Sequence, residues 1–171
     1  QMCIRDRRDA QTHWRADAGP ACVIGAGGAA RAVIAGLLDE GAIEIRLSNR
    51  SDGKAVDMAQ EFGPRVQAVP WTLRHDALAG AALLVNTTNQ GMHGQPALDL
   101  RLDALPRSAL VSDIVYVPLE TPLLVEAKAR GNATVNGLGM LLNQARPAFE
   151  AWFGPLPAIS PALLDKVLAS F

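Results

Sequence analysis

A short apolar run at residues 21–24 leads directly into a glycine-containing turn, and an apolar pattern of helical period follows the turn. The turn reads Gly25-Ala26-Gly27-Gly28-Ala29. Glycines at such a junction let the chain reverse tightly and let the backbone approach a pyrophosphate, while the amides of the new helix face the phosphates. A plain tight turn is the alternative interpretation, and the residues elsewhere in the chain distinguish the two.

The composition favours one globular unit. The chain has 171 residues, 49% of them hydrophobic and 19% charged, which is enough to bury one good core. A net charge of −1 argues against binding to nucleic acid or to an anionic membrane. No apolar stretch reaches the roughly 18 residues of a membrane span, and no signal-peptide pattern is visible. We expect Cys22 to be a small buried thiol. Because unpaired thiols are typical of the reducing cytoplasm, the sequence predicts a cytoplasmic protein.

Short β-type runs alternate with longer helical patterns along most of the chain. The strands are predicted at 21–24, 44–48, 66–69, 82–86, 109–114 and 133–135, and the helices at 29–40, 54–62, 121–130, 138–153 and 162–169. This alternation is typical of βαβ units that build a parallel sheet. We therefore predict an α/β fold of the Rossmann type, with a doubly wound, mostly parallel six-stranded sheet in the order 3-2-1-4-5-6.

Changes in this pattern predict the domain boundaries. Residues 1–20 cluster charge and show no sustained apolar period, so we expect a leader that is partly non-native or a residual linker. Residues 21–154 form the predicted nucleotide-binding domain, and residues 155–171 a proline-rich linker with a C-terminal helix. The helix at 138–153 carries more apolar residues than one sheet-facing stripe needs. We expect exposed apolar surface on this helix and on the helix at 162–169, which a neighbouring domain or a second copy in a homo-oligomer would cover.

The residues after the second strand indicate which dinucleotide is bound. An acidic residue at this place would hold the ribose 2′-hydroxyl of NAD. This chain instead has Asn49, Arg50 and Ser51, with Lys54 shortly after. A guanidinium and an ammonium suit a 2′-phosphate, and a guanidinium also stacks on adenine. The pattern favours NADP over NAD; a solvated loop with ordinary surface charges is the alternative.

Polar loops follow the fourth and fifth strands, at the edge of the sheet where ligands bind in open α/β folds. The first reads NTTNQGM at 86–92 and includes Thr87. The second reads DIVYVP at 113–118 and includes Ile114 and Tyr116. Tyr116 alone is equally compatible with a core aromatic residue whose hydroxyl is satisfied. We predict no metal site.

Together these strings resemble the C-terminal, cofactor-binding domain of the shikimate dehydrogenase family. The resemblance covers about residues 19–171 and rests on GAGGAARA, NRS with a following Lys, NTTNQGM, DIVYVPLETPLL and NGLGMLLNQARPAFEAWFG. It implies reversible, NADPH-dependent reduction of the 3-dehydroshikimate ketone to shikimate, a step toward chorismate and the aromatic amino acids. Two alternatives stay open. One is a quinate/shikimate-type dehydrogenase, for which an acid near Asn49 is expected; the other is a stand-alone nucleotide-binding regulatory module.

The resemblance also implies roles for single residues. The pyrophosphate would lie on the glycine turn and the 2′-phosphate on the loop after the second strand, and two residues would border the nicotinamide, Ile114 and Gly137. Tyr116 and Gln144 match family positions that touch shikimate. The complete set implied for the cofactor is Gly25, Ala26, Gly27, Gly28, Ala29, Asn49, Arg50, Ser51, Lys54, Thr87, Ile114 and Gly137.

Some features depart from the family's pattern. Asn136 stands where an acid is common, and Asn89 and Gln90 differ from the usual residues. Family members also carry a separate N-terminal substrate domain with a catalytic Lys and Asp. We expect that domain to be absent, so no catalytic residue is assigned in this chain, which would bind NADP and be inactive alone. His75 and His93 are the remaining acid–base candidates, and solvated loop histidines are the simpler interpretation.

Overall fold

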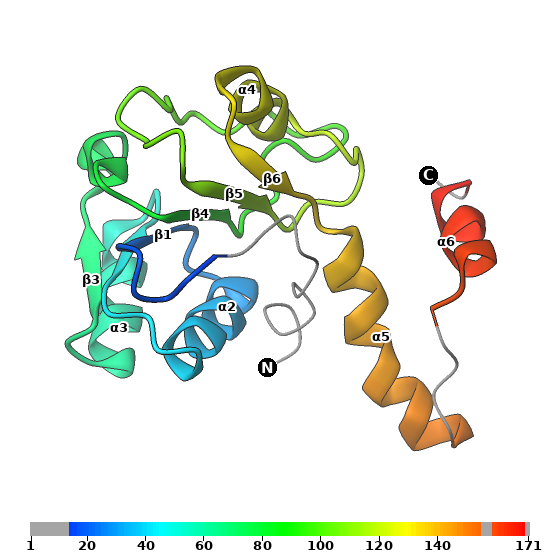
Figure 1. Ribbon diagram of the computed structural model, residues 1–171. Coiled ribbons are helices and arrows are strands. Elements are labelled where there is room, and N and C mark those ends of the chain that lie inside the picture. Colours follow the sequence, from blue (N-terminus) through cyan, green and yellow to red (C-terminus); the bar gives the residue numbers. More distant parts are fainter. Residues whose placement is uncertain (1–13, 155–158, 170–171) are drawn as a thin grey trace.

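A computed structural model describes residues 14–154 and 159–169. Its centre is a sheet of six strands, namely β1 (Ala21–Ile24), β2 (Ile45–Ser48), β3 (Val66–Val69), β4 (Leu83–Asn86), β5 (Leu110–Asp113) and β6 (Ala133–Val135). The order across the sheet is β3-β2-β1-β4-β5-β6, and all neighbouring pairs are parallel (Figure 1). The predicted fold class and strand order are confirmed.

Five α-helices are present in the described residues. They are α2 (Gly28–Asp39), α3 (Asp52–Phe62), α4 (Pro122–Arg130), α5 (Leu138–Phe153) and α6 (Pro161–Leu168). The helix predicted at 54–62 begins two residues earlier than expected, because the two residues after the Ser51 N-cap already have helical conformation. Two 3₁₀ turns between β3 and β4 were not predicted, η1 (Trp71–Leu73) and η2 (Asp76–Leu78), because a single turn carries no apolar period.

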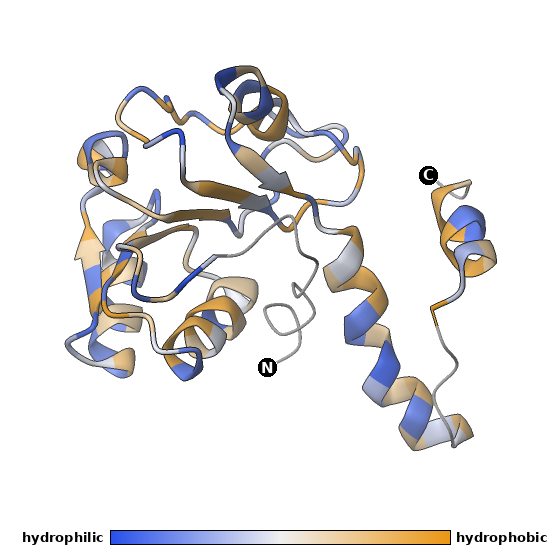
Figure 2. Ribbon diagram, viewed as in Figure 1, coloured by the Kyte–Doolittle hydropathy of each residue, from blue (hydrophilic) through white to orange (hydrophobic). Residues whose placement is uncertain are grey.

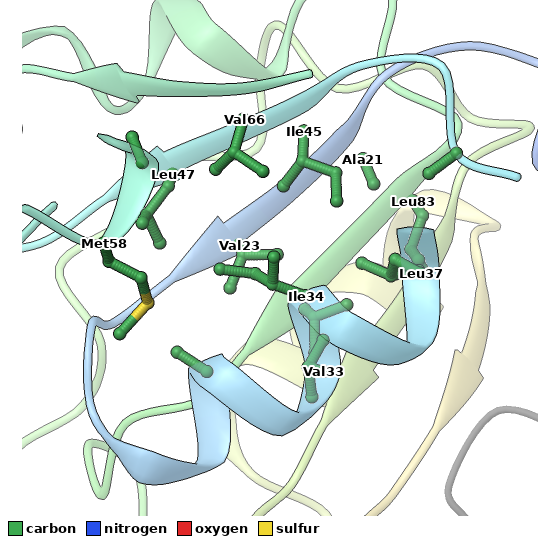
Figure 3. Close-up of a cluster of buried hydrophobic side chains, with 14 of the residues drawn as sticks. Ala21, Val23, Val33, Ile34, Leu37, Ile45, Leu47, Met58, Val66 and Leu83 are labelled. Atoms are coloured by element: carbon green, nitrogen blue, oxygen red, sulfur yellow. The ribbon is translucent and has the colours of Figure 1, made fainter. Parts of the chain in front are cut away.

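Two apolar clusters cover the two faces of the sheet, and successive strand residues alternate between them. Val23 belongs to the cluster that α2 and α3 complete, where Ile34 and Leu37 of α2 point toward the strands (Figure 3). Its neighbours Cys22 and Ile24 belong to the other cluster, which η2 and α4 complete. Burial on both faces explains why the central strands read as continuous apolar runs.

Cys22 is a buried free thiol, as predicted. Its Sγ donates to the carbonyl oxygen of Ala77 at 3.1 Å. Burial raises the pKa of this thiol to about 12. The thiol therefore stays protonated and serves as a small packing group in the second cluster.

The last two helices leave the body of the domain and expose apolar side chains. Figure 1 shows α5 extending away from the sheet, and Asn143 is its one buried residue. Near its C-terminal end Trp152 is 79% exposed and Phe153 68% exposed, and α6 exposes Leu163 (Figure 2). The expectation of apolar surface on these helices is confirmed.

Some of the predicted segments lie outside the described residues. These are residues 1–13 of the predicted leader and residues 155–158 of the predicted linker. Within the described residues, no helix combines the length and the apolar character that a membrane crossing requires.

Candidate functional site

The glycine turn after β1 is pinned to the strands on both sides. The N–H of Gly25 donates to the carbonyl oxygen of Ser48 at 2.8 Å. Gly25 has φ +107°, and a Cβ on it would lie 2.7 Å from Thr87 Oγ1 and 2.9 Å from Thr88 Cγ2. Both the backbone conformation and the space therefore require glycine here. The Thr87 hydroxyl is turned inward and donates to the carbonyl oxygen of Ile24 at 2.7 Å.

The N-terminus of α2 is open at this turn. Gly27 is the N-cap and supplies no side-chain hydrogen bond to the helix amides. Gly27 and Gly28 are exposed, and no atom lies within 4 Å of the position that a Cβ would take on either. The first amides of α2 thus have no side-chain partner, and the helix dipole favours an anion beside them. Ala29, in the first turn, is half-buried. This cradle fits a pyrophosphate.

Asn49 ties the glycine turn to the loop after β2. Its Oδ1 accepts from the N–H of Ala26 at 3.2 Å, and its Nδ2 donates to the carbonyl oxygen of Ser51 at 2.9 Å. Ser51 is the N-cap of α3. Arg50 and Lys54, on either side of this cap, are exposed. Arg50 and Lys54, the two cations predicted to bind a phosphate, therefore lie in the segment that Asn49 hydrogen-bonds to the glycine turn.

A pocket of about 320 Å³ lies beside the turn. Its lining residues are Gly25, Asn49, Arg50, Trp71, Thr88, Asn89, Gln90, Gln95 and Pro96. The structure thus brings three predicted cofactor residues together, Gly25, Asn49 and Arg50. Thr88 lines the pocket and its neighbour Thr87 does not, a distinction that the string NTTNQGM alone could not make. Trp71 was missed because an isolated aromatic residue after a strand carries no pattern.

A buried polar network joins the loops that follow β4 and β5. Asp113, 1% exposed, accepts through Oδ1 from Asn86 Nδ2 and from the N–H of Val115, both at 3.0 Å. Its Oδ2 accepts from the Thr121 hydroxyl at 2.7 Å. Burial raises the pKa of Asp113, and the three hydrogen bonds oppose that rise. Asn86 Oδ1 in turn accepts from the N–H and the hydroxyl of Thr88, at 3.0 and 2.8 Å.

The residues expected at the nicotinamide lie against each other. The N–H of Gly137 donates to the carbonyl oxygen of Val115 at 3.0 Å, and a Cβ on Gly137 would lie 2.0 Å from the carbonyl oxygen of Ile114. Tyr116 is half-buried and Gln144 is exposed on α5. Neither is among the residues that line the pocket. The roles implied for these four residues stay predictions.

The histidines in the described residues have no acid–base arrangement. His75 Nδ1 accepts from the N–H of Arg101 at 3.0 Å. Desolvation lowers the pKa of His75, and the charges of Arg74 and Arg101 lower it further. His93 is exposed. No group of three His, Cys, Asp or Glu side chains in the described part of the chain could hold a metal ion.

A family model described as shikimate / quinate 5-dehydrogenase matches residues 10–117. The chain belongs to this family. It is 58% identical over 156 residues to the shikimate dehydrogenase (NADP(+)) of Paramagnetospirillum magneticum, covering 91% of this chain and 56% of that protein. The corresponding protein of Dinoroseobacter shibae is 54% identical, with 97% of this chain and 60% of that protein covered. The chain thus spans somewhat more than half the length of these relatives.

Two solved structures in this family share the fold closely. Shikimate 5-dehydrogenase from Thermus thermophilus, in complex with NADP(H) and shikimate, gives a TM-score of 0.74 at 39% identity, with 89% of this chain and 55% of that chain covered. Quinate dehydrogenase from Corynebacterium glutamicum, in complex with NAD, gives a TM-score of 0.80 at 28% identity, with 90% of this chain and 56% of that chain covered.

We predict that Asp113→Ala destabilises this member of the family. The substitution leaves the Val115 amide and the Thr121 hydroxyl buried without their acceptor, which should lower the free energy of unfolding by about 2–4 kcal/mol. Asp113→Asn is the matched control, because it keeps the shape and one acceptor oxygen and should cost only about 1 kcal/mol. Urea unfolding followed by circular dichroism measures both. Equal urea midpoints for Asp113→Ala and the wild type would contradict the prediction.

We also predict opposite effects of alanine at two neighbouring glycines. Gly137→Ala places a methyl group into the backbone of Ile114 and should lower the free energy of unfolding by about 1–3 kcal/mol. Gly139, in the first turn of α5, has open space where a Cβ would lie, so Gly139→Ala should stabilise by up to about 1 kcal/mol. Thermal melts of the two variants and the wild type test this. A Gly137→Ala protein that melts at the wild-type temperature would contradict the close approach of Gly137 to the Ile114 backbone.

Proposed function

We propose that this chain binds NADP and takes part in the reversible, NADPH-dependent reduction of 3-dehydroshikimate to shikimate. The observation that carries the proposal is the open N-terminus of α2 beside a pocket lined by Arg50, with no acidic side chain among the lining residues. Dinucleotide-binding folds that take NAD use an acid at this place, whereas a guanidinium accommodates the 2′-phosphate of NADP. Relatives named NADP(+) shikimate dehydrogenases support the same assignment.

Each part of the site has a binding role in this proposal. The amides of Gly27 and Gly28 hold the pyrophosphate, and Arg50 and Lys54 hold the 2′-phosphate. Thr87 acts indirectly, because its inward hydroxyl fixes the glycine turn. When bound, the nicotinamide supplies hydride to the ketone or takes it from the alcohol. The pyrophosphate assignment uses an α2 N-terminus that no side chain caps, and the 2′-phosphate assignment uses two exposed cations.

The substrate end of the site is formed by the loop after β5 and the start of α5. In this proposal the nicotinamide lies beside Gly137, whose backbone closely approaches that of Ile114. Tyr116, in the loop after β5, and Gln144, on α5, would bind the hydroxyl groups of the ring. A phenol and an amide both donate and accept hydrogen bonds, as a polyhydroxylated substrate requires. The Thermus thermophilus neighbour holds shikimate together with NADP(H), which supports a joint site.

Reduction of a ketone also needs a proton donor close to the nascent alkoxide. Of the nine residues that line the pocket, Arg50 alone is ionisable, and a guanidinium does not exchange protons near neutral pH. Asp113 has both carboxylate oxygens engaged by buried donors. We therefore place the acid–base pair in the part of the longer relatives that this chain does not match, and we assign no catalytic residue among the described ones.

We expect this chain to bind NADPH about tenfold or more tightly than NADH, because charge-assisted bonds to the 2′-phosphate are absent with NADH. Calorimetric titration with both cofactors measures the preference. Arg50→Ala and Lys54→Ala should each reduce it. Lys166→Ala on α6 is the control, since that cation is exposed far along the chain from the turn. A preference that survives both site substitutions would exclude the 2′-phosphate role.

We expect the 171-residue chain to bind NADP without oxidising shikimate at an enzyme-like rate, because the described site lacks an acid–base pair. The absorbance of the reduced nicotinamide follows the reaction. Fusion to the unmatched segment of the Paramagnetospirillum magneticum relative should restore turnover. Shikimate-dependent turnover by the pure, unfused chain would show that the acid–base pair lies within it.

A further inference from the structure

Trp71 stands at the pocket wall, next to the residues proposed to hold the 2′-phosphate. Strands β2 and β3 are parallel and in register, with Ser48 opposite Val69. The segments that continue from these two positions therefore leave the sheet side by side. Arg50 follows β2 and Trp71 follows β3, and both line the same pocket. Trp71 and Arg50, which carry an indole and a guanidinium, thus line one cavity.

The position of Trp71 is held from several sides. The backbone N–H of Trp71 donates to Oδ1 of Asp52, the first residue of α3, at 2.8 Å. The carbonyl oxygen of Trp71 accepts from Arg74 Nη1 at 2.9 Å. The side chain is half-buried and packs against the apolar cluster on the α4 face of the sheet. Hydrogen bonds thus hold the backbone of Trp71, and apolar packing holds its side chain, beside the pocket.

Arg74 occupies one face of the indole. Its guanidinium carbon lies 4.5 Å from the ring centroid, and its side chain is 11% exposed. Arg74 Nε donates to the carbonyl oxygen of Asp99 at 2.8 Å, and Nη2 pairs with the Asp99 carboxylate. Arg74 is not among the residues that line the pocket. Trp71 lines the pocket, and the cation that covers one face of its ring does not.

We propose that Trp71 is the stacking surface for the adenine ring of NADP, with the Arg50 guanidinium as the second planar group at the ring. This inference rests on the proposed function. A purine offers a π-face to an aromatic side chain and to a guanidinium alike. The nicotinamide cannot be the partner, because Ile114 follows β5, four strand spacings or about 19 Å across the sheet from β3. Trp71 thus determines affinity for the adenosine half of the cofactor.

The test uses 2′,5′-ADP, which carries the adenine and the 2′-phosphate but no nicotinamide. Trp71→Leu keeps an apolar side chain against the core and removes the π-face, so it should weaken binding by about 5- to 100-fold. Trp71→Phe keeps a π-face and should retain most of the affinity. Trp152→Leu, at an exposed position on α5, is the control and should bind like the wild type. Thermal melts without ligand should give equal midpoints for the two Trp71 variants, which separates stacking from stability.

A second measurement leaves Trp71 intact. The chain has three tryptophans, so a Trp14→Phe, Trp152→Phe background makes the emission report Trp71 alone. Addition of 2′,5′-ADP should quench this emission, as expected for an indole under a purine. No quenching despite binding, or wild-type affinity in Trp71→Leu, overturns the role of Trp71 and leaves the proposed function standing. Failure of the wild type to bind 2′,5′-ADP or NADPH overturns both.

Discussion

The buried hydrogen bond between Asn86 and Asp113 is the interaction on which the ligand-facing edge depends. It joins the last residues of β4 and β5, which lie opposite each other in the sheet. A buried carboxylate is costly, and the raised pKa of Asp113 reflects that cost. The cost is offset by hydrogen bonds from three donors: Asn86 at the end of β4, Val115 just after β5, and Thr121, the N-cap of α4. Hydrogen bonding to this one carboxylate thereby fixes both ends of the connection between β5 and α4, and Asn86 extends the network to Thr88 in the loop after β4.

The strand order explains why the glycine turn and these loops meet. The chain moves from β1 outward to β3 and then returns to place β4 on the other side of β1, so the direction of winding reverses beside β1. Loops leaving the carboxyl ends of β1 and β4 separate there and open a crevice. The Thr87 hydroxyl donates to the carbonyl oxygen of Ile24 at the end of β1, and the N–H of Gly25 donates to that of Ser48 at the end of β2, so the glycine turn is joined to the strands on either side of β1. The position of the pocket is therefore a consequence of topology, and its chemistry comes from the few side chains that reach it.

Local sequence patterns predicted the strands, most helix limits and the glycine turn, because apolar period and turn residues act over a few positions. Thr121 was predicted to begin a helix, and its hydroxyl does accept from the N–H of Leu124. That the same hydroxyl donates to Asp113 could not be predicted, because the network depends on which strands become neighbours. Trp71 is a similar case, since its place at the pocket depends on β3 lying in register beside β2. The roles of Tyr116 and Gln144 rest on family resemblance alone, because no spacing rule indicates a contact with a polyhydroxylated ring.

Gly137, the N-cap of α5, lies against the loop after β5, where its N–H donates to the carbonyl oxygen of Val115. Gln144 lies two turns along α5 from Gly137, a distance of about 10 Å at the rise of an α-helix. A substrate bound by Tyr116 and Gln144 would therefore lie along the first turns of α5, whereas the pocket beside Gly25 lies toward the β2 and β3 side of the sheet. In the arrangement that we propose, an extended dinucleotide would span this separation, with adenine at Trp71 and nicotinamide at Gly137. Trp152 and Phe153 are exposed near the C-terminal end of α5, the helix that also carries Gln144. A protein surface that covered these two aromatic residues would therefore contact the same helix.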